Sequence, residues 1–300
     1  MSQVELESFI ANEHDNPTVA LFPIRDLSLK TGVNSVTLRA WERRYGLLKP
    51  QRTAKGHRLY SEADIKQVEA ILYWVQQGVA VSKVRALIEK GAEETPNLDS
   101  DWQLLQTSLI NAAKAFNADK IHQLCAEVLS QYPASIAVQN WLLPSLALLA
   151  KGVEGSFCEA VVSEELTVRL HGLKKQHGSG RKALVGAAAG GSNLWGIMAS
   201  FILADQGVSC EFVSNLASAD DCVALSKGLD VSGLMVFCGN EQASQVAGFV
   251  AKVQQPNIPV VLVGAKLWLA YHESKVDEAE NVAIFSDPIE GVQSFLTKIS

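Results

Sequence analysis

The segment from Thr37 to Tyr60 gathers positively charged side chains at a spacing that suits contact with a polyanion. Its sequence, TLRAWERRYGLLKPQRTAKGHRLY, has one acidic residue, Glu42. The basic residues are Arg39, Arg43, Arg44, Lys49, Arg52, Lys55, His57 and Arg58. Guanidinium groups donate hydrogen bonds to guanine edges and to phosphates, whereas a solvated basic surface needs no such partner. The elements that carry these residues decide between the two interpretations.

The positive charge is confined to one part of an acidic chain. The 300 residues carry a formal net charge of −6. Residues 21–91 contain 13 Lys and Arg against 6 Asp and Glu, while the remainder contains 13 against 26. A basic module attached to an acidic body indicates a polyanionic partner at the N-terminal end alone.

Two short helices are predicted in and before the basic segment. The first covers about Ile24 to Thr31 and ends at Gly32, because glycine readily adopts the left-handed conformation that closes a helix. Asn34 or Ser35 then caps a second helix, which runs to about Tyr45. Two helices joined by a short turn that contains Gly form the helix-turn-helix pattern.

The second of these helices has two different faces. Leu38, Trp41 and Tyr45 are spaced to pack inward, although a role in base stacking stays open for Tyr45. Arg39 and Arg43 lie four residues apart and share another face, beside Arg44. A recognition helix of this kind can enter the major groove of double-stranded DNA. We therefore favour DNA contact over a solvated basic surface.

A two-stranded hairpin is predicted after the recognition helix. The stretch LLKPQRTAKGHRLY is too rich in Pro, Gly and basic residues for a helix, and its turn is expected near Thr53–Gly56. Arg52, Lys55, His57 and Arg58 on this hairpin would reach the flanking DNA backbone or the minor groove. Such contacts supply affinity that depends on salt.

The whole chain is expected to be a multidomain α+β and α/β protein. The expected parts are a flexible N-terminus (1–20), a winged helix-turn-helix domain (21–91), a four-helix bundle (101–177, with helices at 101–116, 118–131, 134–151 and 157–176) and a doubly wound, Rossmann-like parallel sheet (182–300). Linkers are expected at EETPNLDSD and HGSGR. A doubly wound sheet binds ligands at the carboxyl ends of its strands.

Several classes of protein are disfavoured by the composition. The five cysteines are scattered without a CxxC pair, so neither a disulfide nor a metal site is expected. No apolar run approaches the roughly 18 residues of a membrane helix, and the N-terminus lacks the features of a signal peptide. We also find no nucleophile elbow and no carboxylate pair in a convincing setting. The expectation is a cytoplasmic, nucleoid-associated protein without a membrane partner, and not an enzyme.

The stretch IRDLSLKTGVNSVTLRAWERRYGLLKPQRTAKGHRLYSEADI resembles the winged helix-turn-helix of the MerR family, in particular its CarA/CarH/LitR and MlrA branch. The resemblance implies a dimeric transcription regulator that binds an inverted-repeat operator, distorts promoter DNA and acts on RNA polymerase at the promoter. It places Arg39, Arg43, Arg44 and Tyr45 in the recognition helix, and Arg52, Lys55, His57, Arg58 and Tyr60 in the wing. Metal- and drug-sensing MerR regulators usually add a long dimerisation helix. Here the fourth helix ends at Gly91, so self-association is expected to rest on the acidic body.

The order of a helical bundle followed by an α/β domain is similar to cobalamin-binding modules, which this branch carries. Light-sensing relatives have a W-x9-E-H pattern in the bundle and an E/D-x-H-x-x-G loop whose His ligates cobalt. The equivalent residues in this chain are Gly152, Val162, Ser163, Gly191, Asn193 and Gly196. Asn and Ser are poor cobalt ligands beside imidazole, so histidine-ligated cobalamin is disfavoured. No cofactor is expected, and cobalamin stays the alternative.

The loop GAAAGGSNLWG admits one further interpretation. Gly190, Gly191 and Gly196 follow a predicted strand and open a helix, which suits backbone contact with phosphate. The spacing matches neither of the glycine-rich nucleotide motifs, so we favour tight packing of strand against helix. The prediction is thus a DNA-binding regulator whose C-terminal part serves assembly or the sensing of an unidentified signal. A cobalamin- or light-responsive regulator is the alternative.

Overall fold

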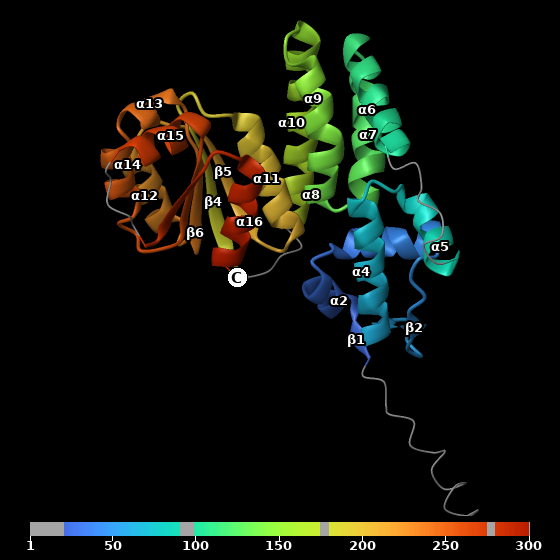
Figure 1. The fold of residues 1–300 in the computed structure, drawn as a ribbon. Coiled ribbons are helices and arrows are strands. Elements are labelled where there is room, and N and C mark those ends of the chain that lie inside the picture. The colour runs from blue at the N-terminus through green and yellow to red at the C-terminus, as the bar shows by residue number, and fades with distance from the viewer. Residues whose placement is uncertain (1–20, 91–98, 175–179, 275–279, 300) are drawn as a thin grey trace, which may run out of the picture.

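The chain forms three groups of elements that follow one another in sequence. The computed structural model describes residues 21–90, 99–174, 180–274 and 280–299. We call the groups the N-terminal unit (22–90), the helical unit (99–174) and the C-terminal unit (182–298). In Figure 1 the blue N-terminal unit lies below the green helical unit, and the yellow-to-red C-terminal unit lies beside the helical unit. The predicted flexible N-terminus lies outside the described residues.

The N-terminal unit begins with the two predicted helices. Helix α2 (Ile24–Thr31) ends at Gly32, whose φ of 68° is left-handed, as the sequence predicts. Of the two candidate caps for α3 (Ser35–Ala40), Asn34 is the one used: its side-chain oxygen accepts a hydrogen bond of 2.8 Å from the backbone N–H of Val36. The helix then continues as a π-helical turn, η2 (Trp41–Tyr45). This turn was not predicted.

The remaining elements of this unit include the predicted hairpin. They are β1 (Phe22–Pro23), β2 (Gln51–Arg52), β3 (Arg58–Tyr60), α4 (Glu62–Gln76) and α5 (Val81–Lys90). The strands pair antiparallel in the order β1-β3-β2. The turn between β2 and β3 is closed by hydrogen bonds from Thr53 N–H to the His57 carbonyl (2.9 Å) and from Gly56 N–H to the Thr53 carbonyl (2.8 Å). The hairpin and its turn are therefore confirmed.

The helical unit consists of α6 (Asp99–Lys114), α7 (Ala118–Gln131), α8 (Ala134–Ala137), η3 (Val138–Leu142), α9 (Leu143–Leu149) and α10 (Val153–Lys174). Helix α6 begins inside the stretch predicted as a linker, the rest of which lies outside the described residues. Helix α10 begins at Val153, before the predicted residue 157. Gly155 was taken for part of the break, yet it lies within α10. A Cβ there would collide with the Leu149 carbonyl, so the glycine permits close packing of α10 on α9.

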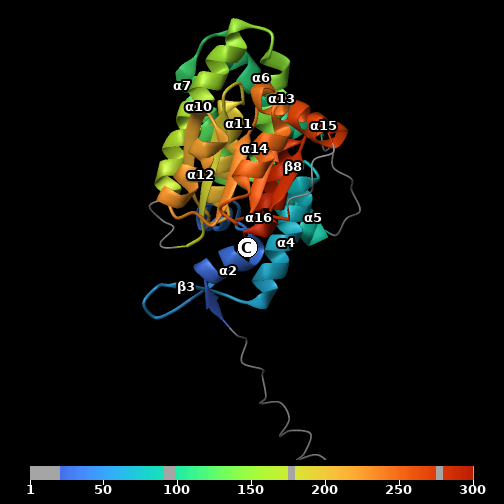
Figure 2. The ribbon, with the colours of Figure 1, turned by 90° about the vertical axis from the view of Figure 1, so that its left-hand side faces the viewer.

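The C-terminal unit is a parallel sheet with helices on both faces (Figures 1 and 2). Its strands are β4 (Lys182–Ala188), β5 (Ser209–Leu216), β6 (Gly233–Phe237), β7 (Val260–Val263) and β8 (Val282–Phe285), in the order β5-β4-β6-β7-β8. Its helices are α11 (Asn193–Asp205), α12 (Ala219–Gly228), α13 (Asn240–Ser244), α14 (Val246–Val253), α15 (Ala265–Glu273) and α16 (Pro288–Lys298). Helices α11 and α16 pack together on one face, and α11 also packs against α10 of the helical unit.

One hydrophobic core runs through all three units. It includes Trp41 of the N-terminal unit, Trp141 of the helical unit, and Phe201 and Phe295 on α11 and α16. A second core, which contains Leu234 of β6, fills the opposite face of the sheet. Because apolar contacts are continuous across the units, we expect the three to be held against one another rather than to swing freely.

The turn between α7 and α8 is where the three units meet. Gln131 accepts a hydrogen bond from the indole N–H of Trp41 at its carbonyl (2.7 Å) and one from the hydroxyl of Tyr45 at its side-chain oxygen (2.6 Å). Ala134 donates its backbone N–H to a carboxylate oxygen of Asp205 at the end of α11 (3.0 Å). We call residues 130–134 together with Asp205 and Gln206 the junction. It connects the recognition helix to the sheet unit.

Candidate nucleic-acid interface

The recognition helix, formed by α3 and η2, is fixed by its apolar inner side. Leu38 and Trp41 are both fully buried, as their spacing predicts. The helix ends at Gly46, with a left-handed φ of 60°. In a π-helical turn the backbone hydrogen bonds span five residues, and such turns often lie at functional sites. The turn sets the direction in which the residues after Trp41 point.

The outer side of the recognition helix carries two uncommitted arginines. Arg39 and Arg43 are exposed, and neither makes an ion pair or a hydrogen bond among the described residues. A free guanidinium presents a planar fork of donors that matches the acceptor edge of guanine in the major groove. The structure therefore leaves available the two side chains that are best placed to contact bases.

The wing is tied to the recognition helix by the single acidic residue of the basic segment. Glu42 forms one ion pair with Arg52 (Oε1 to Nη2, 3.1 Å) and another with Arg58 (Oε2 to Nε, 2.5 Å). Glu42 also raises the pKa of Arg58 through this hydrogen bond. At the tip of the hairpin Lys55 and His57 are exposed. The clamp on Glu42 fixes the angle between helix and wing, and it leaves the tip free to meet a phosphate backbone.

Two further predicted contacts are held by the helical unit. The hydroxyl of Tyr45 donates to Gln131, and burial raises the pKa of this hydroxyl. Arg44 is exposed, with one Nη1 contact to the Ser130 hydroxyl at 3.4 Å. To meet DNA, these two side chains would have to leave the junction or reach past it.

Tyr60 differs from its expected role as a DNA contact. Its side chain is fully buried in the core, so it cannot reach DNA in this structure. Its hydroxyl has no hydrogen-bond partner in the part of the chain that the structure describes, and burial raises its pKa to about 12. The resemblance placed Tyr60 correctly in the wing, since it ends β3. A tyrosine in an amphipathic hairpin can face either the solvent or the core, and the side chain of Tyr60 faces the core.

This arrangement of helix, turn, helix and wing can be compared with known proteins. Residues 22–90 match the family model described as "MerR HTH family regulatory protein". Residues 22–90 are a MerR helix-turn-helix domain. The resemblance seen in the sequence is thereby confirmed for this part of the chain.

Two regulators illustrate the likeness. The chain is 40% identical over 126 residues to the HTH-type transcriptional regulator MlrA of Salmonella typhimurium strain LT2, which covers 42% of this chain and 51% of MlrA. It is 28% identical over 156 residues to the HTH-type transcriptional repressor CarH of Myxococcus xanthus, which covers 47% of this chain and 52% of CarH. The chain thus spans about half the length of the curated relatives it matches.

A solved structure of a cobalamin-binding protein from Desulfitobacterium hafniense is a more distant neighbour. It aligns with 65% of this chain and 98% of its own, at 9% identity and a TM-score of 0.34. At this score the likeness carries no functional argument, so the second candidate site is judged from its own residues.

That second site is the carboxyl edge of the sheet. The strand order reverses at β4, so the ligand crevice of such a sheet would open between the loops after β4 and β6. Those loops are packed backbone to backbone. A Cβ on Gly191 would collide with the Phe237 carbonyl, and one on Gly239 would collide with the backbone of Ala189 and Gly190. The crevice is closed by contacts that only glycine permits.

The residues at the cobalamin positions do not fit the cofactor. Gly191 has no room for the acidic side chain of the pattern, and Asn193 begins α11 as an exposed residue. Val162 is fully buried in the core, and Gly152 lies exposed in the turn before α10. Gly196 packs against the ring of Phe212. Ser163 alone of this set carries a hydroxyl, a weak ligand for cobalt. Together these residues do not form a cobalamin site.

Three features of the MerR domain and its surroundings were missed from the sequence. They are the clamp of Glu42 on the wing arginines, the π-helical turn and the docking of the recognition helix on Gln131. The clamp could have been suspected from Glu42, because it is the single acidic residue in a basic segment. Nothing in the local pattern around Gln131 indicated that a residue ninety positions away from Trp41 accepts its indole N–H.

Proposed function

We propose that this chain is a DNA-binding transcription regulator that recognises an inverted-repeat promoter site as a homodimer or larger assembly. The observation that carries the proposal is the pair Arg39 and Arg43, which are exposed on the recognition helix of a MerR domain and pair with no residue that the structure describes. Arginine that contacts guanine is the commonest specific contact in the major groove. The wing, with Lys55 and His57 at its tip, supports contact with the adjacent backbone.

The experiment that tests this function is selection from a random duplex library with the full chain. We expect one sequence to be enriched, with two half-sites that are inverted with respect to each other, because a symmetric dimer reads a symmetric site. Footprinting should then place the protected bases within both half-sites. A library that stays random after repeated rounds would contradict the proposal.

We further propose that the dimer is built by the body rather than by the MerR domain. The described part of helix α5 is Val81–Lys90, and Gly91 follows it in the sequence, where a glycine is expected to end the helix before it is long enough for a coiled coil between two chains. A fragment of residues 1–95 should therefore bind the selected site much more weakly than the full chain, since it loses bivalency. A stable dimer of that fragment with near-full affinity would assign dimerisation to the MerR domain.

We propose no enzymatic activity, and we assign to the rest of the chain a four-helix bundle and a doubly wound sheet that serve assembly or sensing. We propose that the DNA-bound regulator acts on RNA polymerase at the promoter. The alternative is a regulator that responds to cobalamin, which the resemblance of the sequence to the CarA/CarH/LitR and MlrA branch implies. Addition of adenosylcobalamin, and illumination, distinguish this alternative from a regulator without cobalamin.

We expect desalted protein to show no cobalamin spectrum. We also expect its DNA affinity to be unaffected by adenosylcobalamin or by light. Stoichiometric cobalamin in the purified protein would establish the alternative.

A further inference from the structure

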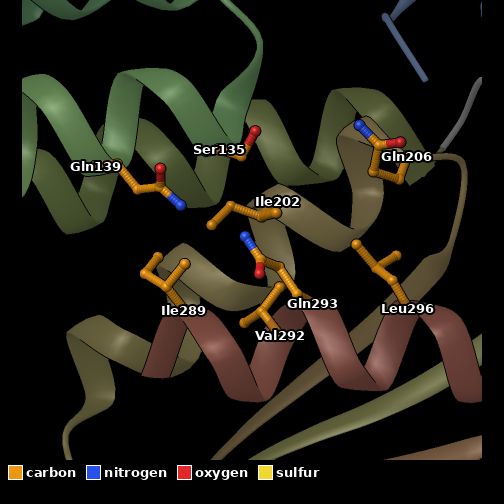
Figure 3. Close-up of a pocket in the computed structure, with 8 residues that line it drawn as sticks. All are labelled: Ser135, Gln139, Ile202, Gln206, Ile289, Val292, Gln293 and Leu296. Atoms are coloured by element: carbon orange, nitrogen blue, oxygen red, sulfur yellow. The ribbon is translucent and has the colours of Figure 1, made fainter. Parts of the chain in front are cut away.

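A small pocket lies between the helical unit and the C-terminal unit, away from the carboxyl edge of the sheet. Its volume is about 120 Å³. It is lined by Ser135 of α8, Gln139 of η3, Ile202 of α11, Gln206 directly after α11, and Ile289, Val292, Gln293 and Leu296 of α16 (Figure 3). Gln293 is exposed, so the pocket opens to solvent. Pockets between two units are a common place for small ligands in proteins.

The lining is uncharged and half apolar, and three of its polar side chains have no protein partner among the described residues. Half of the lining is aliphatic, and no lining residue carries a charge. The side chains of Ser135, Gln139 and Gln293 make no hydrogen bond among the described residues, and Figure 3 shows the two amides pointing toward one another across the pocket. Each glutamine amide offers two donors and an acceptor. The pocket thus combines an apolar floor with free hydrogen-bonding groups.

We propose that this pocket binds a small uncharged ligand with an apolar ring and an amide or similar group. An apolar cavity of roughly 150 Å³ accommodates benzene, so a pocket of this size with an open mouth suits a single ring. A charged ligand would lose its hydration without meeting an opposite charge, which is costly. A primary amide can instead pair with Gln139 and Gln293, because its donors and acceptor complement theirs.

The same pocket is connected to the MerR domain through Gln206. The side-chain N–H of this residue donates to the carbonyl of Gly32, in the turn between α2 and α3, at 2.6 Å. The neighbouring Asp205 bonds to the N–H of Ala134 in the same junction. A ligand that draws the Gln206 amide into the pocket would break the bond to Gly32 and loosen the recognition helix from the junction. Tyr45 and Arg44, now held there, would become available.

This regulatory consequence rests on the proposed function, whereas ligand binding itself does not. Binding is therefore measured first, without DNA, on the full chain. The probe is benzamide, and the matched controls are benzoate and benzylamine, which have the same ring and a charge. We expect calorimetry or ligand-observed NMR to show weak but saturable binding of benzamide and at least about tenfold weaker binding of both controls.

Two variants assign the binding to this pocket. Gln139→Leu with Gln293→Leu keeps side-chain volume and removes both amides, so benzamide affinity should fall about tenfold. Gln103→Leu, an exposed glutamine on α6, is the control and should leave the affinity unchanged. Equal binding of benzamide and benzoate, equal binding to both variants, or no benzamide binding at all would overturn the proposal.

The connection is then tested as operator affinity with and without saturating benzamide. We expect the wild type to bind its selected operator about fivefold more tightly with benzamide, the change that one ordinary hydrogen bond produces. Gln206→Leu should bind tightly without benzamide and should not respond to it. Unchanged operator affinity in the wild type would refute the connection. Operator binding without benzamide reports on the proposed function alone, so the two can fail separately.

Discussion

The recognition helix and the carboxyl edge of the sheet are the two regions where the sequence predicts that a ligand could bind, yet they differ in what they leave available. On the recognition helix, Arg39 and Arg43 are exposed and have no partner among the described residues. At the sheet edge, Gly191 and Gly239 bring two loops into backbone contact where a ligand would enter. The exposed guanidinium donors support the proposal that the first region is an interface, whereas the backbone contact in the second region leaves no opening for a ligand.

The largest effect is expected from Arg43→Ala. If Arg43 contacts a base edge, its loss should weaken operator binding by about 1–3 kcal/mol and relax discrimination between operator and scrambled duplex. Fluorescence anisotropy at physiological salt measures both. Arg169→Ala, on α10 far from the wing, is the matched control and should bind like the wild type. An Arg43→Ala variant with unchanged affinity would contradict the proposal that the exposed arginines of the recognition helix contact DNA.

At the sheet edge, Gly191→Ala should cost about 1–3 kcal/mol in the free energy of unfolding, because the new Cβ collides with the Phe237 carbonyl. Operator affinity should change little when the variant is folded. Urea denaturation gives the stability. The control is Gly248→Ala, where a Cβ meets open space. Equal stability of the two variants would show that the loops are not tightly closed.

Lys55→Ala tests the tip of the wing and should give a smaller loss. A phosphate contact carries no sequence information, so affinity for operator and for scrambled duplex should fall together. The slope of log affinity against log salt should decrease by about one. Titrations at several salt concentrations measure this slope. A loss confined to the operator would instead place Lys55 against a base.

The fold could be read from the sequence where local signals agree. Helix α2 begins and ends where its pattern predicts because Gly32 supplies the left-handed residue at its end. The hairpin turn was also predictable from a local signal, because the Pro, Gly and basic residues of this stretch disfavour a helix. At the candidate site, helical periodicity alone predicted that Arg39 and Arg43 are exposed and that Leu38 is buried.

What could not be predicted depends on contacts between distant segments. The start of α10 was misplaced because Gly155 packs on a neighbouring helix instead of breaking its own. Tyr45 and Trp41 meet Gln131 only once the units are assembled, and periodicity along one helix does not identify the partner. Tyr60 shows the same limit, because its hydroxyl suggested an exposed wing residue although the ring lies in the core.

The junction between the two compared regions should respond to pH. Burial raises the pKa of Asp205 from 3.8 to about 6. The folded protein therefore binds this proton more readily than the unfolded chain, so the stabilisation is present below about pH 4 and is lost as the pH rises to about 6. Asp205→Asn should be more stable than the wild type at pH 7, by about 1 kcal/mol. Denaturation across this pH range measures the difference, and a difference that does not change with pH would contradict the assignment.

The smallest effect is expected from Tyr60→Phe. The hydroxyl of Tyr60 is buried and has no partner within residues 21–90, 99–174, 180–274 and 280–299, so its removal should leave the free energy of unfolding unchanged or raise it by up to about 1 kcal/mol. Operator affinity should stay the same, because the side chain does not reach the surface. Parallel denaturation and anisotropy curves check both. A clear loss of affinity would return Tyr60 to the set of DNA contacts.

The central claim, that the free arginines of the MerR domain read a DNA sequence, is tested most directly by one competition experiment. Labelled operator from the selection is bound by the wild-type chain of 300 residues at physiological salt and is displaced by unlabelled operator or by scrambled duplex of the same length. We expect the scrambled duplex to compete at least about a thousandfold less well. Equal competition by the two duplexes would show that the basic face binds polyanions without reading them.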